Sequence, residues 1–113
     1  MPKPDHLIRE EFDEAVNMAA SELREWLETD ESLSVGWKGK DGNAPESVGH
    51  ASGRRIVTLL TKKQGELTDE DYSHMRKVVG YVHRHRAQRP ENIYTSRWRY
   101  SLMNWGHDPT KEA

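Results

Sequence analysis

Apolar residues recur three and four positions apart along most of this 113-residue chain, a spacing typical of α-helices that bury one face. No segment alternates apolar and polar residues over the length of a β-strand, and no internal repeat is present. The chain is long enough for one compact domain and too short for two ordinary ones. We therefore expect an all-α fold, a single compact domain of four to five helices that spans residues 1–113.

The core of this domain must be thin, because 34% of the residues are hydrophobic, 32% are charged and the mean hydropathy is −1.00. Four tryptophans offset this polarity, since rings of that size would otherwise be left in water. We expect these side chains to close the core. They are Trp26, Trp37, Trp98 and Trp105.

Two absences narrow the classes of function. The chain has no cysteine, which excludes disulfides, thiolate metal sites and thiol nucleophiles. Its apolar runs, such as Ile56-Val57 and Leu59-Leu60, are too short to span a membrane, and the first residues, MPKP, form no apolar signal core. We expect a cytoplasmic protein without a membrane partner, associated with the nucleoid if it binds DNA.

The first helical segment covers residues 5–29, either as one helix or as two with a break near Ala19 or Ser21, and the sequence around Asn17 favours the break. Residues 30–45 are rich in Asp, Ser, Gly, Lys and Asn, which predicts an ordered loop. Trp37 is the one large side chain of that loop. We expect its indole to be buried and to anchor the loop.

The basic helical part covers residues 46–109. One helix is expected from Glu46 or Ser47 to Lys63, with small residues at 49, 52 and 53 that form a flat patch for close packing. A second should run from a capping box at residues 68–71 to about Ala87, before Pro90. A last helix should start after Thr95 and end at Gly106.

Charge is segregated along the chain. Residues 1–53 hold five basic and twelve acidic side chains, a balance of −7, whereas residues 72–99 hold seven basic side chains and one acidic, a balance of +6. The net charge of −2 therefore hides two opposed fields. A concentrated positive face raises the local density of anions such as a phosphate backbone.

The helix expected after residue 68 carries the densest group of cations. At about 100° per residue, Arg76, Lys77, His83 and Arg84 share one face around Gly80. Arginine presents a planar fork of donors that matches phosphate oxygens. The alternative is a solvated face neutralised by the acidic first helix, which is the usual role of a run of charges.

Two further segments carry candidate contacts. The helix start at residues 47–55 could bind a phosphate through free amides, Ser47, His50 or Ser52, although its small residues fit close helix packing equally well. Residues 97–109 alternate aromatic residues with arginines, and Arg97, Arg99 and Tyr100 are candidates for contact. Three other residues of that segment share a face and should pack in the core. They are Trp98, Leu102 and Trp105.

The six histidines predict no metal site, because no pair has ligand spacing. No triad can be argued from the spacing of His50, His74 or His107, and we expect no catalytic residue and no cofactor. An enzyme acting on nucleic acid would have only His50, His74 and Ser52 to offer. A lone histidine is more often a hydrogen-bonding core residue.

Three blocks of the sequence resemble a known family. They are ESVGH and SGRRIV (46–50 and 52–57), HMRKVV and YVHRH (74–79 and 81–85), and RWRYSLMNWGHDP (97–109). The family consists of small bacterial and fungal proteins catalogued as a domain of unknown function, and its members are often labelled DNA-binding proteins. The likeness covers nearly the whole chain. It implies DNA binding but provides no mechanism or catalytic residue.

We therefore predict a double-stranded DNA-binding protein of low sequence specificity that contacts phosphates through a basic helical face. Arg76, Lys77 and Arg84 are the expected centre of that face. The full set of predicted contacts is Arg54, Arg55, Lys62, Arg76, Lys77, Arg84, Arg86, Arg97 and Arg99. The alternative is a protein-interaction or self-association module, such as a homodimer, in which the basic surface meets an acidic patch.

Overall fold

The computed structural model describes residues 3–111, which contain six α-helices, two short 3₁₀ helices and no strand. The all-α, single-domain expectation is confirmed for this part, with one α-helix more than the four to five expected; residues 1–2 and 112–113 of the expected domain lie outside it. The α-helices are α1 (Asp5–Ala15), α2 (Ala20–Leu27), α3 (Asp30–Ser34), α4 (Val48–Thr61), α5 (Asp69–Arg86) and α6 (Arg97–Asn104). The 3₁₀ helices are η1 (Gln64–Glu66) and η2 (Pro109–Lys111). Residues 3–111 contain no helix with the length and hydropathy of a transmembrane span.

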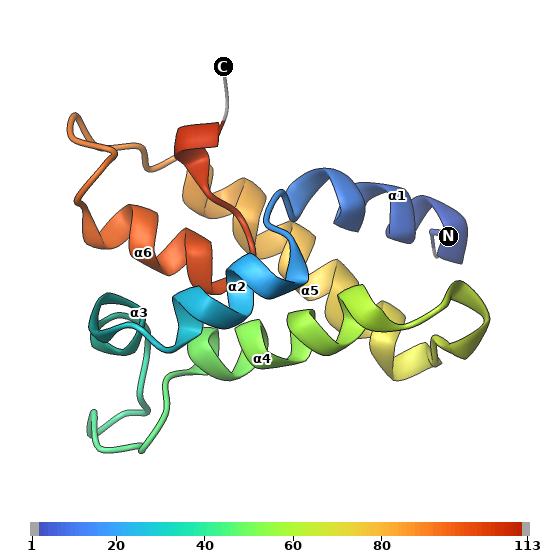
Figure 1. Cartoon of the computed structure of the whole chain (residues 1–113), viewed down its shortest axis with the longest axis horizontal. Helices are drawn as coiled ribbons and strands as arrows, with labels where there is room; N and C mark the ends of the chain where they lie inside the picture. Colours follow the sequence, from blue (N-terminus) through green and yellow to red (C-terminus); the bar gives the residue numbers. More distant parts are fainter. Residues whose placement is uncertain (1–2, 112–113) are drawn as a thin grey trace.

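The helices pack as two pairs that meet at α6. Figure 1 shows α2 beside α4, with α5 running behind them and α1 packed against α5. The short helix α6 contacts α2, α3, α4 and α5. One hydrophobic cluster fills the space between the helices and forms the core of the domain. Its largest fully buried members are Phe12, Leu23, Ile56, Leu59, Met75 and Leu102.

The break in the first helical segment is confirmed. α1 ends at Ala15, and the backbone amides of Asn17 and Met18 leave the helical pattern to donate hydrogen bonds to the carbonyl of Gly106, at 3.1 and 3.2 Å. These bonds satisfy two amides that a continuous helix would have used internally. The link between α1 and α2 is therefore pinned to the segment that follows α6.

The loop expected at residues 30–45 differs from the prediction in two ways. Its first five residues form the short helix α3, capped by the Thr29 hydroxyl, which accepts a hydrogen bond from the Ser32 amide at 3.2 Å. The prediction that Trp37 is buried was wrong, because 62% of its surface is exposed. Val35 anchors the loop instead, with 1% exposed, and the next residue, Gly36, turns the chain with φ +101°.

Close contact between α4 and α6 depends on the small residues of α4, as predicted. A Cβ atom at Gly53 would lie 2.5 Å from the Asn104 carbonyl oxygen and 2.7 Å from Leu27 Cδ2. Only glycine lets the two backbones approach this closely. The flat patch of α4 therefore serves helix packing.

The ends of α5 and α6 follow their predicted signals. Thr68 and Asp71 form the expected capping box of α5, in which each side-chain oxygen accepts a bond from the other residue's amide at 3.1 Å. After α6, the amides of Gly106 and His107 donate to the carbonyls of Met103 and Leu102, at 2.9 and 3.0 Å. This pattern is a Schellman motif, and Gly106 supplies the positive φ of +82° that it needs.

Candidate nucleic-acid interface

Three cations on α5 are open to solvent. Arg76, Lys77 and Arg84 are all exposed, and within residues 3–111 none of their side chains forms an ion pair or a hydrogen bond. The Arg84 guanidinium lies across Gly80, where an added Cβ atom would meet its NH1 at 2.9 Å. The absence of a side chain at residue 80 thus makes room for a cation, and no other helix supplies a neighbour to Gly80 at that distance.

The acidic first helix does not pair with these three cations. Its ion pairs are local: Lys3 binds Glu11, and the Arg9 Nε donates to Asp13 at 3.1 Å. α1 packs against α5 through apolar residues such as Ile8 and Phe12. The carboxylates of α1 therefore leave the open cations of α5 without a bound counter-charge.

Several of the other predicted contacts are already held by carboxylates. The Arg54 guanidinium forms a two-point ion pair with Glu46, and this pairing lowers the pKa of Glu46 to about 2. Arg54 lines a hollow with His50 and residues of α2. The Arg54 side chain therefore lies beside α2 instead of beside the open cations of α5, and its contact with nucleic acid stays a prediction.

Lys62 and Arg55 share one buried carboxylate. The Lys62 Nζ donates to Asp71 at 2.8 Å, and Arg55 approaches the same side chain at 3.5 Å. The bond from Lys62, helped by the amide of Thr68, lowers the pKa of Asp71 to about 2. Lys62 is therefore a structural cation that joins the end of α4 to the start of α5. Arg55 is more exposed and keeps part of its guanidinium toward solvent.

Arg99 and Arg97 are likewise engaged. Arg99 is partly buried, makes a forked contact to Asp108 at 3.2 Å for both bonds, and also donates to the Tyr94 carbonyl at 2.7 Å. Burial alone would raise the pKa of Asp108, but the bonds from Arg99 and Thr110 outweigh it and lower that pKa. Arg99 thus fastens the segment around Asp108 to α6, and its contact with nucleic acid stays a prediction.

Arg97 donates a hydrogen bond to the Ser34 carbonyl at 3.0 Å, which ties α6 to the end of α3, although its side chain remains exposed. Tyr100, another candidate, packs against Trp26 with ring centroids 5.6 Å apart. Arg86 lines a second hollow of about 360 Å³ at the end of α5, together with His83, Arg89 and Trp98. These positions frame the basic face without belonging to its centre.

Lys77 links three adjoining hollows between α4 and α5. Arg55 and His74 line two of them with Lys77, and the largest, of about 450 Å³, lies at the α6 end. The hollows share lining residues and adjoin one another along the exposed side of α5, and we refer to them together as the groove. This groove is the feature that the sequence did not reveal.

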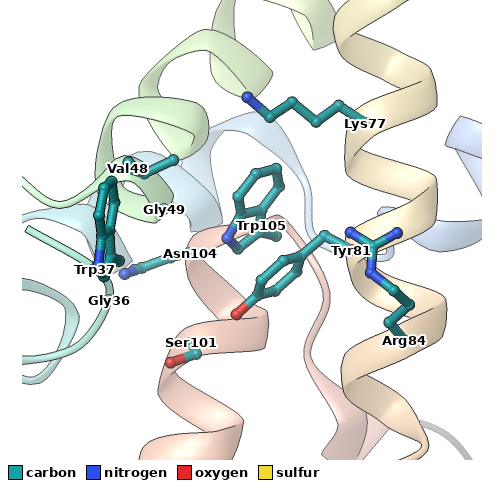
Figure 2. Close-up of a pocket in the computed structure, with 10 residues that line it drawn as sticks. All are labelled: Gly36, Trp37, Val48, Gly49, Lys77, Tyr81, Arg84, Ser101, Asn104 and Trp105. Atoms are coloured by element: carbon teal, nitrogen blue, oxygen red, sulfur yellow. The ribbon is translucent and has the colours of Figure 1, made fainter. Parts of the chain in front are cut away.

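Figure 2 shows the largest hollow in detail. Trp37 and Val48 stand on one side, the rings of Tyr81 and Trp105 on the other, and the Lys77 amine reaches toward the space between them. The remaining residues of its lining are Gly36, Gly49, Arg84, Ser101 and Asn104. The hollow has aromatic walls, two cations and no carboxylate in its lining.

The wall formed by Tyr81 and Trp105 belongs to a continuous column of five rings. In order, the rings are His74, Trp105, Tyr81, His85 and Trp98, with successive centroids 6.3, 4.3, 5.1 and 6.4 Å apart and planes within 21° of parallel. Three of them lie on one stripe of α5, and two lie seven residues apart in and just after α6. The column fixes α6 on α5.

His74 and His50 form hydrogen bonds within the fold. His74 Nε2 is 2.9 Å from the Ser52 hydroxyl, and burial, followed by the charges of Arg55 and Lys77, lowers its pKa to about 4. Ser52 itself is buried, with 4% exposed, and lines one of the hollows of the groove with His74. His50 contacts the Leu27 carbonyl at 2.7 Å.

The hydroxyls at the start of α4 are also engaged. Ser47 is buried and accepts the His50 amide at 3.1 Å as the N-cap, so its hydroxyl already serves to cap α4. No group of histidine and acidic side chains in residues 3–111 has the arrangement of a metal site.

Residues 11–103 match a family described as "Protein of unknown function (DUF3140)". The chain belongs to this family. The match includes α2 to α5 and most of α6, and therefore every residue of the groove except Asn104 and Trp105. The chain matches no curated protein and no solved structure. DUF3140 membership confirms the domain-of-unknown-function resemblance, while the DNA-binding label and the bacterial and fungal origin stay predictions.

Proposed function

We propose that this protein binds nucleic acid, with duplex DNA as the expected ligand, by placing the exposed side of α5 against the phosphate backbone. The observation that supports the proposal is the contrast between cations. Arg76, Lys77 and Arg84 have no partner within the described residues, whereas Arg54, Lys62 and Arg99 are held by carboxylates. Unpaired cations on one helix side can meet several phosphates without first breaking an ion pair.

Contacts to phosphates carry little sequence information, so we expect low sequence specificity and strong dependence on salt. A protein that neutralises about five phosphates should give a slope of log K against log salt of roughly −4 to −5. The three cations of α5 should account for about 2 to 3 of that slope. Such binding would place the protein on the nucleoid.

The test compares two variants with the same change in charge. The first replaces Arg76, Lys77 and Arg84 with Ala. The control replaces three exposed cations outside α5 that also lack a partner within residues 3–111: Arg24, Lys40 and Lys63. Affinity for a labelled duplex should be measured from about 50 to 200 mM salt, the range over which phosphate contacts lose most affinity.

We expect the α5 variant to lose affinity and to show a flatter slope, while the control changes both far less. Equal effects of the two variants would reduce the proposal to a non-specific charge effect, and unchanged binding by the α5 variant would refute it. Parallel titrations with RNA and heparin separate duplex DNA from polyanions in general.

The charge opposition between residues 1–53 and 72–99 supports self-association as the alternative. Light scattering across a salt series, without nucleic acid, tests it. An electrostatic dimer should dissociate as salt rises. A dimer abolished by the α5 variant would assign the basic face to a protein partner.

A further inference from the structure

We propose that the hollow between Trp37 and Trp105 receives the base of an unpaired nucleotide, whose phosphate lies on Lys77 and Arg84. The inference rests on the proposed function and makes it more specific: phosphates follow α5, and a base that has left its stack enters the adjoining hollow. DNA with unpaired bases should then bind more tightly than fully paired DNA. Four features of the hollow support this assignment.

The first feature is an exposed indole at the edge of the hollow. Trp37 exposes 62% of its surface in a chain with few hydrophobic residues. Its carbonyl accepts the Val48 amide at 2.9 Å, and Gly36 holds the preceding turn, where a Cβ atom would meet Ser47 Oγ at 2.6 Å. The loop thus presents the ring at the mouth of the hollow. A base can stack on such a ring whatever its identity.

The second feature is a donor without an acceptor. Trp105 is buried, with 5% of the residue exposed, but its indole N–H is not enclosed: it opens on the hollow and makes no hydrogen bond within residues 3–111. In Figure 2 this nitrogen faces the hollow. An indole nitrogen can only donate, so an N–H that opens on a hollow and has no protein partner can bind an acceptor placed there. Ring nitrogens and carbonyls of a base are acceptors of this kind.

The third feature is a glycine that keeps this donor uncovered. A Cβ atom at Gly49 would lie 2.9 Å from Trp105 Nε1. Any other residue at position 49 would therefore press against the N–H or cover it. Glycine at position 49 therefore allows close packing with α6 and also leaves the Trp105 N–H accessible.

The fourth feature is the charge around the hollow. Its lining includes Lys77 and Arg84 and no carboxylate, which favours an anion over a cation. The volume of about 450 Å³ lies within the range of small-molecule sites. A planar heterocycle that carries a phosphate fits the ring of Trp37, the donor of Trp105 and the two cations together.

The test measures binding to three labelled DNAs of one length: a single strand, a full duplex, and a duplex interrupted by three unpaired nucleotides. Trp37→Ala should weaken binding to the two DNAs with unpaired bases by about 5- to 100-fold, the range for loss of one stacked base. Duplex affinity should change by less than about 2-fold, since phosphate contacts remain. Tyr94→Ala is the matched control, because Tyr94 is equally exposed, at 65%, and lies outside the hollow.

Two further variants separate stacking from hydrogen bonding. Trp37→Phe should keep most of the affinity for the single strand, because it keeps a ring. Trp105→Phe keeps the ring column and removes the N–H, and we expect a loss of about 5-fold confined to DNA with unpaired bases. Thermal unfolding of each variant verifies that it folds.

The outcomes distinguish this inference from the proposed function. Salt-dependent duplex binding with no preference for unpaired bases, or with no effect of Trp37→Ala on that preference, overturns the pocket assignment alone. Absence of binding to all three DNAs overturns both. Titration with adenosine 5′-monophosphate tests the remaining source of the same chemistry. Binding of the mononucleotide in the hollow would quench indole fluorescence in the parent protein and not in Trp37→Ala. If that result came without a preference among the three DNAs, it would assign the hollow to a free nucleotide.

Discussion

Gly53→Ala is the most direct test of the packing that positions the groove. The added methyl would lie 2.5 Å from the Asn104 carbonyl oxygen and 2.7 Å from Leu27 Cδ2. A methyl needs about 3.5 Å from such neighbours, the usual separation of non-bonded heavy atoms. α4 and α6 would therefore have to separate by up to about 1 Å, or Leu27 would have to leave its rotamer.

The expected magnitude combines two opposing effects. Overpacking of a close helix contact costs roughly 1–3 kcal/mol and sometimes more. Replacing a helical glycine with alanine returns about 1 kcal/mol through the lower entropy of the unfolded chain and better helix propensity. Because the Asn104 oxygen belongs to the backbone and cannot rotate away, we place the cost at the upper end of its range. The net loss should be about 1–3 kcal/mol.

Gly80→Ala provides the matched control, since its methyl would meet only the mobile Arg84 guanidinium. That variant should gain about 0.5–1 kcal/mol. Urea unfolding monitored by circular dichroism measures both changes, and melting temperatures should move in opposite directions, by roughly 4 °C for each kcal/mol. A Gly53→Ala protein as stable as the parent chain would refute the proposed closeness of α4 and α6.

Three further predictions concern stability. Asn104→Leu should cost about 2–4 kcal/mol in urea unfolding, because the buried Asn104 side chain accepts from Trp26 Nε1 at 2.8 Å and its loss leaves that donor and the Ser32 groups unpaired. Asp108→Asn should lower the melting temperature through the loss of about 1–3 kcal/mol, since the Arg99 guanidinium would keep only neutral partners. Between pH 7.5 and 5 the free energy of unfolding should fall by about 1–2 kcal/mol, because His74, with its pKa lowered to about 4, resists the proton that the unfolded chain takes up near pH 6.5. His74→Gln should reduce this fall, and an identical pH profile in that variant would contradict the assignment.

Features that depend on neighbouring residues could be predicted from the sequence. The capping box of Thr68 and Asp71, the stop at Gly106 and the break after Ala15 each arise from signals within a few positions. The close-packing role of Gly53 could also be inferred, because small residues on an apolar helix face have few other uses. These are the elements that the structure confirms.

Features that depend on distant contacts could not be inferred. Burial of Trp37 was expected from its size alone, but the turn at Gly36 and the anchoring of Val35 turn the indole outward. α3 has only five residues, too few to show helical periodicity. The pairing of Arg99 with Asp108 was also hidden, because it requires the reversal of the chain at the Schellman motif.

The aromatic column had a signal that could have been found. Spacings of seven and four along α5, and of seven from Trp98 to Trp105, place all five rings on facing stripes. The distinction between open and paired cations had no such signal, since it depends on where each carboxylate lies in the folded chain. Charge counts alone therefore could not show that Arg54, Lys62 and Arg99 are paired with carboxylates.

The ring column gives the two sides of the hollow unequal stiffness. Tyr81 and Trp105 stack on each other and on the rings of His85 and His74. This side of the hollow is therefore held in place by the packing of α5 and α6. Trp37 lies on a loop that is held on one side by the buried Val35 and on the other by the hydrogen bond from the Val48 amide to the Trp37 carbonyl. Ligands of different size would therefore be accommodated by movement of the loop that carries Trp37, while α5 and its cations stay in position.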